Sequence, residues 1–225
     1  MAYEDLHCRE TAWLNSAVAT AVCIESVPRR VFASALDWPG WCRSGRTEDE
    51  ALEILAAYAK RYAVVAAVSG TVFSPDAGER LEVVERLEGN STTEFGVPAI
   101  PADYERQPVN KTEAKRLAAL VLACWQVFDD VVAVAPAELR KGPRGGGRDR
   151  DQIERHVSDA EISYARKLGV RLGNDLPAIR AALIGLLGSP CDDAPVVEKG
   201  WPPRYGARRI AWHVMDHAWE IEDKS

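Results

Sequence analysis

The chain of 225 residues changes its pattern near residue 100, and this change most constrains how it can fold. Before that point, runs rich in β-branched residues are separated by turn residues, whereas after it apolar residues recur at helical spacing. Strands followed by a series of helices are typical of an α+β chain. We therefore expect a small α+β domain at residues 1–100 and an antiparallel four-helix bundle at residues 101–225.

The first half begins with a predicted β-hairpin, because residues 18–26 and 31–37 are β-rich and a short turn joins them. The other elements expected here are a Pro-Gly turn at residues 37–41, a strand at 41–44, a helix after the capping box Thr47–Glu50, and strands at 64–73 and 81–88. This order predicts an α+β domain.

The second half contains four segments with helical periodicity. The predicted helices lie at residues 111–134, 149–168, 176–187 and 204–222, after a proline-containing linker at 97–108. A loop rich in glycine and basic residues, at residues 137–150, separates the first two helices. Four helices with short connections favour a bundle, whose core commonly hosts metal sites.

The composition excludes several classes of protein. The net charge is −6 and the pI about 5.4, so no general attraction to nucleic acid is expected. No apolar run reaches the ~20 residues of a membrane span, and the acidic N-terminus is unlike a signal peptide. Five cysteines without Cys-x-x-Cys spacing indicate reduced thiols. We expect a cytoplasmic protein without a membrane or nucleic-acid partner.

Three of the four histidines point to a metal site. His213 and His217 are four residues apart, which places both imidazoles on one face of the last helix. His156 lies on the apolar stripe of another predicted helix. Three histidines with a vacant fourth position are typical of a catalytic metal centre. The alternative is that each is a core histidine bonded to a carbonyl group.

Three carboxylates follow the histidines by three residues each, namely Asp159, Asp216 and Glu220. Each can accept a hydrogen bond from an imidazole or act as a base. The alternative is that they are solvated or paired with nearby arginines on the same helices.

The basic loop supplies candidate substrate-binding residues, Arg144, Arg148 and Arg150. Arginine side chains and the start of the following helix together suit a carboxylate or phosphate. The spacing does not fit a P-loop or a dinucleotide motif. The alternative is a solvated linker.

Residues 152–168 and 208–223 resemble the two signature segments of the DinB/YfiT-like four-helix-bundle superfamily. The resemblance covers about residues 110–223 and implies a metal-binding triad at His156, His213 and His217. It also implies metal-dependent thiol transferases and isomerases, often with a low-molecular-weight thiol, although other members have no known activity. Zinc is the first choice of divalent metal, with nickel and iron as alternatives, because imidazole suits all three.

Residues 31–58 resemble the HicB-like antitoxin domain, in which a strand, an Asp-x-Pro-Gly-Trp turn and a helix follow one another. The resemblance implies a β-β-β-α-β fold over roughly residues 15–70. No DNA-binding tail follows, so antitoxin activity is not carried over. This domain is expected to serve in homodimerisation, in closure over the bundle or as scaffold.

These observations lead to two hypotheses of function. In the first, the chain is a metal-dependent thiol transferase, isomerase or hydrolase whose three-histidine site acts on a small anionic substrate. In the second, the first domain docks a protein partner, and the bundle is a scaffold or a metal sensor.

Overall fold

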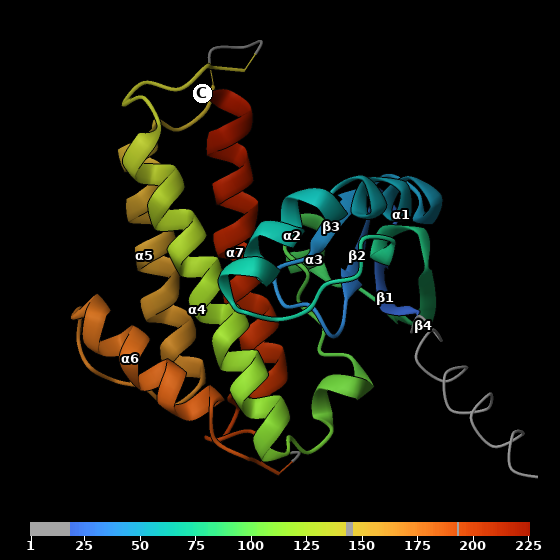
Figure 1. The fold of residues 1–225 in the computed structure, drawn as a ribbon, viewed down its shortest axis with the longest axis vertical. Helices are drawn as coiled ribbons and strands as arrows, with labels where there is room; N and C mark the ends of the chain where they lie inside the picture. The colour runs from blue at the N-terminus through green and yellow to red at the C-terminus, as the bar shows by residue number, and fades with distance from the viewer. Residues whose placement is uncertain (1–18, 143–145, 193) are drawn as a thin grey trace, which may run out of the picture.

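The computed structural model describes residues 19–142, 146–192 and 194–225. In this part of the chain, a four-stranded mixed sheet with short helices is followed by a region of longer helices (Figure 1). The described strands all lie before residue 100, and the four longest helices lie after it. The expected α+β class is therefore confirmed.

The predicted hairpin forms the centre of the sheet. The strands are β1 (Thr20–Val27), β2 (Arg30–Ala35), β3 (Cys42–Gly45) and β4 (Leu81–Glu88), in the spatial order β3-β2-β1-β4. β1 pairs antiparallel with β2 and parallel with β4, and β2 pairs antiparallel with β3. Side chains of β4 alternate between half-buried and exposed. Its charged residues suit an edge strand, because they discourage pairing with another chain.

Two helices connect the antiparallel strands to β4. α1 (Glu48–Ala57) begins after Thr47, whose hydroxyl accepts a hydrogen bond from the Glu50 amide at 3.2 Å. The Glu50 carboxylate accepts from the Arg46 amide at 2.6 Å, one residue before the partner that the capping box predicts. The start of the helix is therefore stabilised from both directions.

The prediction of a strand over residues 64–73 is wrong. Residues up to Val68 belong to α2 (Ala59–Val68), and the rest form a turn and irregular chain. Tyr62 is buried, and so are Val65 and Ala66, which follow it by three and four positions. This segment therefore satisfies the helical period, and its alanines favour a helix.

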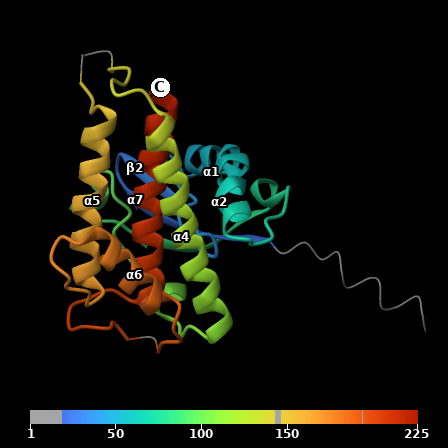
Figure 2. The same ribbon diagram turned by 60° about the vertical axis from the view of Figure 1, so that its left-hand side comes forward.

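The helical region follows the predicted limits within two residues. It comprises α4 (Lys111–Val134), α5 (Arg150–Lys167), α6 (Leu176–Leu187) and α7 (Pro203–Lys224), after the short α3 (Ser91–Glu94) and 3-10 turns at Ala77–Glu79 and Asp103–Arg106. α7 packs against both α4 and α5, and α6 crosses the end of this group (Figures 1 and 2). α7 is therefore central to the region.

α7 is buried nearly all round, because the sheet part covers the side that α4 and α5 leave open. Trp212 and Phe32 of β2 form a T-shaped pair with 6.1 Å between ring centroids, and Trp219 meets Tyr58 at 4.9 Å. One continuous cluster of buried side chains extends from the sheet through α2 into α4 and α7. The two halves therefore share a hydrophobic core.

The turn at residues 37–41 packs closely against α4 and α7. Gly40 has a φ of +98°, and a Cβ atom there would lie 3.1 Å from both Cys124 of α4 and Met215 of α7. Glycine is required for the backbone conformation and for the space.

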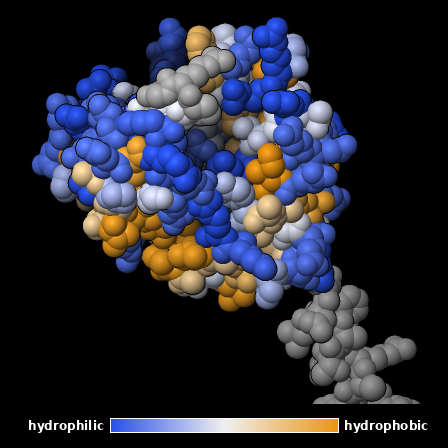
Figure 3. Space-filling view, turned by 90° about the horizontal axis from the view of Figure 1, so that it is seen from above, coloured by the Kyte–Doolittle hydropathy of each residue, from blue (hydrophilic) through white to orange (hydrophobic). Residues whose placement is uncertain are grey.

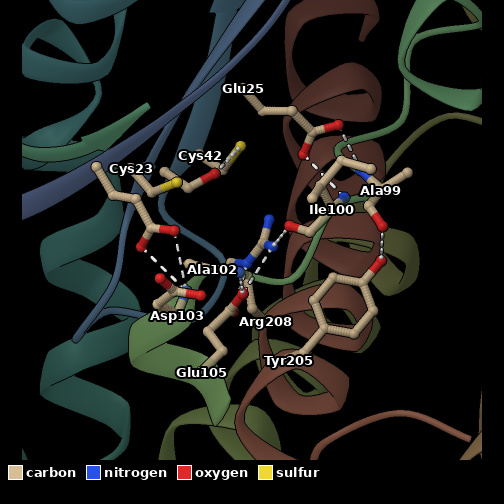
Figure 4. Close-up of polar contacts among 12 residues, drawn as sticks. Cys23, Glu25, Cys42, Ala99, Ile100, Ala102, Asp103, Glu105, Tyr205 and Arg208 are labelled. Carbon is tan, nitrogen blue, oxygen red and sulfur yellow. Dashed lines mark hydrogen bonds and ion pairs between the residues drawn. The ribbon is translucent and has the colours of Figure 1, made fainter. Parts of the chain in front are cut away.

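A buried polar joint, formed by Glu25, Glu105, Tyr205 and Arg208, fastens residues 97–108 between the sheet and α7 (Figure 4). Arg208 donates from Nε and Nη2 to the Glu105 carboxylate at 2.5 and 2.9 Å. Glu25 accepts from the amides of Ala99 and Ile100 in the same segment. The segment predicted as a linker is thus held at both of its faces.

α4 is long and apolar enough to cross a membrane by length and composition alone. Half of its most apolar window is buried, and it packs against α2, α6 and α7. This is the packing expected of a core helix, so the helix gives only weak evidence for a membrane span.

Candidate metal centre

The three histidines of the sequence prediction meet between α5 and α7. The Nε2 atoms of His156 and His213 are 3.2 Å apart, and one ring nitrogen from each histidine lies within 4.8 Å of the others. The His217 ring centroid lies 5.0 Å from that of His156 and 4.7 Å from that of His213. This three-histidine cluster can hold a metal ion.

The helices place these rings through buried apolar neighbours. Ile153 and Val157 anchor α5 on the side that carries His156, and Ile210 and Val214 do the same for α7. Because His213 and His217 are one turn apart on α7, both rings face the same point on α5. The apolar stripes therefore determine the convergence of the imidazoles.

The separation of the nitrogens fits a shared cation. Zinc–nitrogen bonds of about 2.0–2.1 Å in a tetrahedron place two ligand nitrogens roughly 3.3 Å apart. The 3.2 Å between His156 and His213 is close to that value. It also fits a hydrogen bond between two neutral rings, but the presence of a third ring nitrogen within 4.8 Å favours the cation.

Two of the imidazoles are neutral at pH 7. Burial lowers the pKa of His213 to about 2, and the neighbouring histidines and arginines add to the effect. Burial also lowers the pKa of His156, followed by the charge of Arg148. A neutral imidazole has a free lone pair, which is what a metal ion requires.

The metal-free protein is expected to lose stability as the pH falls below about 6.5, the ordinary pKa of histidine. Above that pH, His213 is neutral in both states and contributes nothing. Below it, the unfolded chain takes up a proton that the folded protein refuses, at a cost of up to about 1.4 kcal/mol per pH unit. Urea denaturation at pH 7.5 and 5.5 measures this slope. An equal slope in His213→Asn would contradict the assignment.

Glu220 is the carboxylate that contacts the cluster. Its Oε2 lies 2.7 Å from Nδ1 of His217, and Oε1 accepts from Lys224 at 2.5 Å. The hydrogen bond from His217 lowers the pKa of Glu220 to about 2, and Lys224 contributes in the same direction. An ionised acceptor at Nδ1 keeps the proton there, so that Nε2 of His217 presents its lone pair.

Replacing Glu220 by glutamine is expected to weaken metal binding by about 10–100-fold, because the charged acceptor that orients His217 is lost. Competition against a chromogenic chelator measures the affinity. Glu222→Gln is the matched control, since Glu222 lies two residues further on and pairs with Arg61. Equal affinities of the two variants would show that Glu220 does not act on the site.

The other two candidate carboxylates make no hydrogen bond to the histidines within the described part of the chain. Asp216 forms an ion pair with Arg43 of β3 at 2.9 Å and so ties α7 to the sheet. The side chain of Asp159 is exposed on α5. Among the described residues, neither carboxylate pairs with an arginine of α7. Arg208 binds Glu105 instead, and Arg209 donates to Tyr164.

The basic loop contributes unequally to the site. Arg144 lies outside the described residues. Arg148 is exposed, and its charge contributes to the lowered pKa of His156 and His213. Arg150 donates to the Ala135 carbonyl and to Asp151, both at 2.8 Å.

The surface at the end of the molecule where α7 terminates is mostly hydrophilic and hollowed near its centre (Figure 3).

Sequence reasoning missed one charged residue beside the cluster, Arg209. It lies four residues before His213 on α7, and its Nη2 donates to the hydroxyl of Tyr164 at 3.2 Å. The Tyr164 ring is 5.7 Å from that of His213. The i, i+4 spacing that linked the two histidines also pointed to Arg209.

Comparisons with protein-family models, with curated proteins and with solved structures find no significant match to this chain.

Proposed function

We propose that the protein is a metal-dependent enzyme of the thiol transferase, isomerase or hydrolase type, acting on a small anionic substrate at the three-histidine cluster. The convergence of three ring nitrogens within 4.8 Å carries this proposal. The helical region is proposed to be a DinB-like four-helix bundle, because α4 to α7 pack together and the residues of the signature segments form the cluster.

The donor set fits a divalent metal, with zinc as the first choice and nickel and iron as alternatives. His156, His213 and His217 would hold the ion and leave a coordination position for another ligand. Such an ion supplies a lowered pKa to a bound water or low-molecular-weight thiol. Glu220 holds the proton of His217 at Nδ1, and Arg148 adds positive charge at the exposed side of the cluster.

The N-terminal part is proposed to be a HicB-like domain that serves as scaffold, because its sheet and α1 brace α7. Arg43 of β3 binds Asp216, and Tyr58 packs on Trp219. These contacts lie on α7 within one turn of His213 or His217. Closure over the bundle and homodimerisation remain the other roles proposed for it.

The test is metal content measured by mass spectrometry on protein purified without an affinity tag. About one equivalent of metal is expected in the wild type and none in His213→Ala. Arg155→Ala, which changes an exposed neighbour of His156, is the matched control and should keep its metal. Absence of metal in the wild type after reconstitution would overturn the proposal.

Activity is tested on the loaded protein with small thiols and electrophiles, and with ester and amide substrates. Turnover that needs the metal and disappears in His213→Ala supports the enzyme. A protein that holds one equivalent of metal and turns over none of these substrates would favour the non-catalytic metal sensor.

A further inference from the structure

Arg209 is buried, yet most of its guanidinium N–H groups have no hydrogen-bond partner among the described residues. The residue is 4% exposed. Nη2 donates to the Tyr164 hydroxyl, but Nε and Nη1 are buried and lack a hydrogen-bond partner among the described residues. Three N–H bonds are therefore unsatisfied, since Nε carries one hydrogen and Nη1 two. Leaving a buried charged group in this state is costly.

The other two buried arginines of α7 are paired with carboxylates. Arg204 binds Glu113 at 3.0 Å, and Arg208 binds Glu105 at 2.5 Å. Within the described part of the chain, Arg209 has no such ion pair. Its surroundings are aromatic instead, because the guanidinium carbon lies 5.0–5.7 Å from the ring centroids of Trp212, Tyr164 and Trp201. These rings stabilise the cation but offer it no anion.

The guanidinium lies next to the three-histidine cluster. Arg209, His213 and His217 are spaced by four residues along one face of α7, so that each lies about 5–6 Å from the next at Cβ. On α5, Tyr164 and His156 face them in the same order, with Tyr164 against both Arg209 and His213. One strip between the two helices thus holds the cluster and, one turn away, an unpaired cation.

We propose that Arg209, with Tyr164 and Trp201, binds the carboxylate of a small ligand whose other end reaches the three-histidine cluster. This inference rests on the proposed function and names the class of its substrate. The planar guanidinium can offer parallel N–H bonds to a planar group with two oxygens, which is the geometry of a carboxylate. Tyr164 and Trp201 are half-buried, so the ligand approaches from their side.

A pair of thiols of equal length tests this inference. 3-Mercaptopropionate carries a carboxylate where 3-mercapto-1-propanol carries a hydroxyl, and both offer one thiol to a metal. Their affinities for the zinc-loaded protein are measured by calorimetry. The carboxylate is expected to bind about 10–100-fold more tightly, the value of a charged hydrogen-bonded pair. Equal affinities in the wild type would overturn the inference without any variant.

Arg209→Met is expected to reduce that ratio to near one, and Arg209→Lys to leave an intermediate ratio because the charge remains without the planar fork. If Arg209→Met does not fold, the reduced affinity ratio in Arg209→Lys is the test. Arg148→Met tests the rival anchor in the basic loop. A ratio that collapses in Arg148→Met and survives in the Arg209 variants would overturn the inference.

The metal-free protein separates this inference from the proposed function. Succinate is titrated into it while the tryptophan fluorescence is followed, since Trp201 and Trp212 border the guanidinium. Saturable quenching that is weaker in Arg209→Lys supports the carboxylate site even if no metal binds. Loss of metal binding alone therefore refutes only the proposed function, whereas identical titrations of the two proteins refute the site.

Discussion

Zinc added to the metal-free protein is expected to raise its melting temperature by about 8–16 °C. A ligand that binds only the folded state at a free concentration of 1,000 times its Kd stabilises that state by about 4 kcal/mol. For a chain of this size, each kcal/mol corresponds to about 2–4 °C. The three imidazoles within 4.8 Å provide the site, and differential scanning calorimetry at pH 7.5 measures the shift.

His217→Ala is expected to lose this shift, because only two of the three metal ligands remain. Its melting temperature without metal serves as the baseline for the shift, because His217 is buried and its truncation can itself lower the stability of the metal-free protein. Arg155→Ala should show the full shift. An unchanged zinc response in a folded His217→Ala protein would mean that zinc binds elsewhere.

Glu105→Gln is expected to lower the free energy of unfolding by about 3–5 kcal/mol, because it leaves the buried charge of Arg208 without its counter-ion. Both side chains are at most 5% exposed, so water cannot replace the carboxylate. Urea denaturation of the metal-free protein measures the loss without interference from metal binding.

Two variants show whether the charge pair is the cause. Glu85→Gln changes a carboxylate that binds the same segment at the exposed Asp103 amide, and should cost under about 1 kcal/mol. In the double variant Glu105→Leu with Arg208→Met, both charges are replaced by apolar groups, and most of the stability should return. A double variant as unstable as Glu105→Gln would show that packing, and not the charge, is decisive.

Local signals in the sequence accounted for most of the helix limits. Asn110 caps α4 with its side chain, and the helix begins where the sequence predicted. Gly188 ends α6 at the predicted residue. Such signals act within a few residues and can therefore be read without the fold. The strand wrongly predicted at residues 64–73 shows the limit of such local signals, because a run of alanine and valine is compatible with both the helical and the strand period.

The three-histidine cluster could be predicted only in part, because local signals do not show how helices pack against each other. The four-residue spacing of His213 and His217 is local, but their meeting with His156 depends on how α5 and α7 are rotated against each other. The lack of an ion pair at Arg209 could not be predicted from the sequence. It depends on the fold, which places carboxylates beside the neighbouring Arg204 and Arg208. Both features depend on contacts between residues that are far apart in the chain, and a single sequence does not show which such residues are in contact.

The central position of α7 has a consequence for synthesis of the protein on the ribosome. α7 follows all the other described elements in the chain, and it covers apolar surface of the sheet part and of α4 and α5 at once. Until the 22 residues of α7 have been translated, those apolar surfaces lack their native packing partner. Domains usually fold as they emerge, N-terminal part first. We therefore expect the nascent chain to remain incompletely folded and prone to aggregation until α7 has been synthesised, and to depend on chaperones until then.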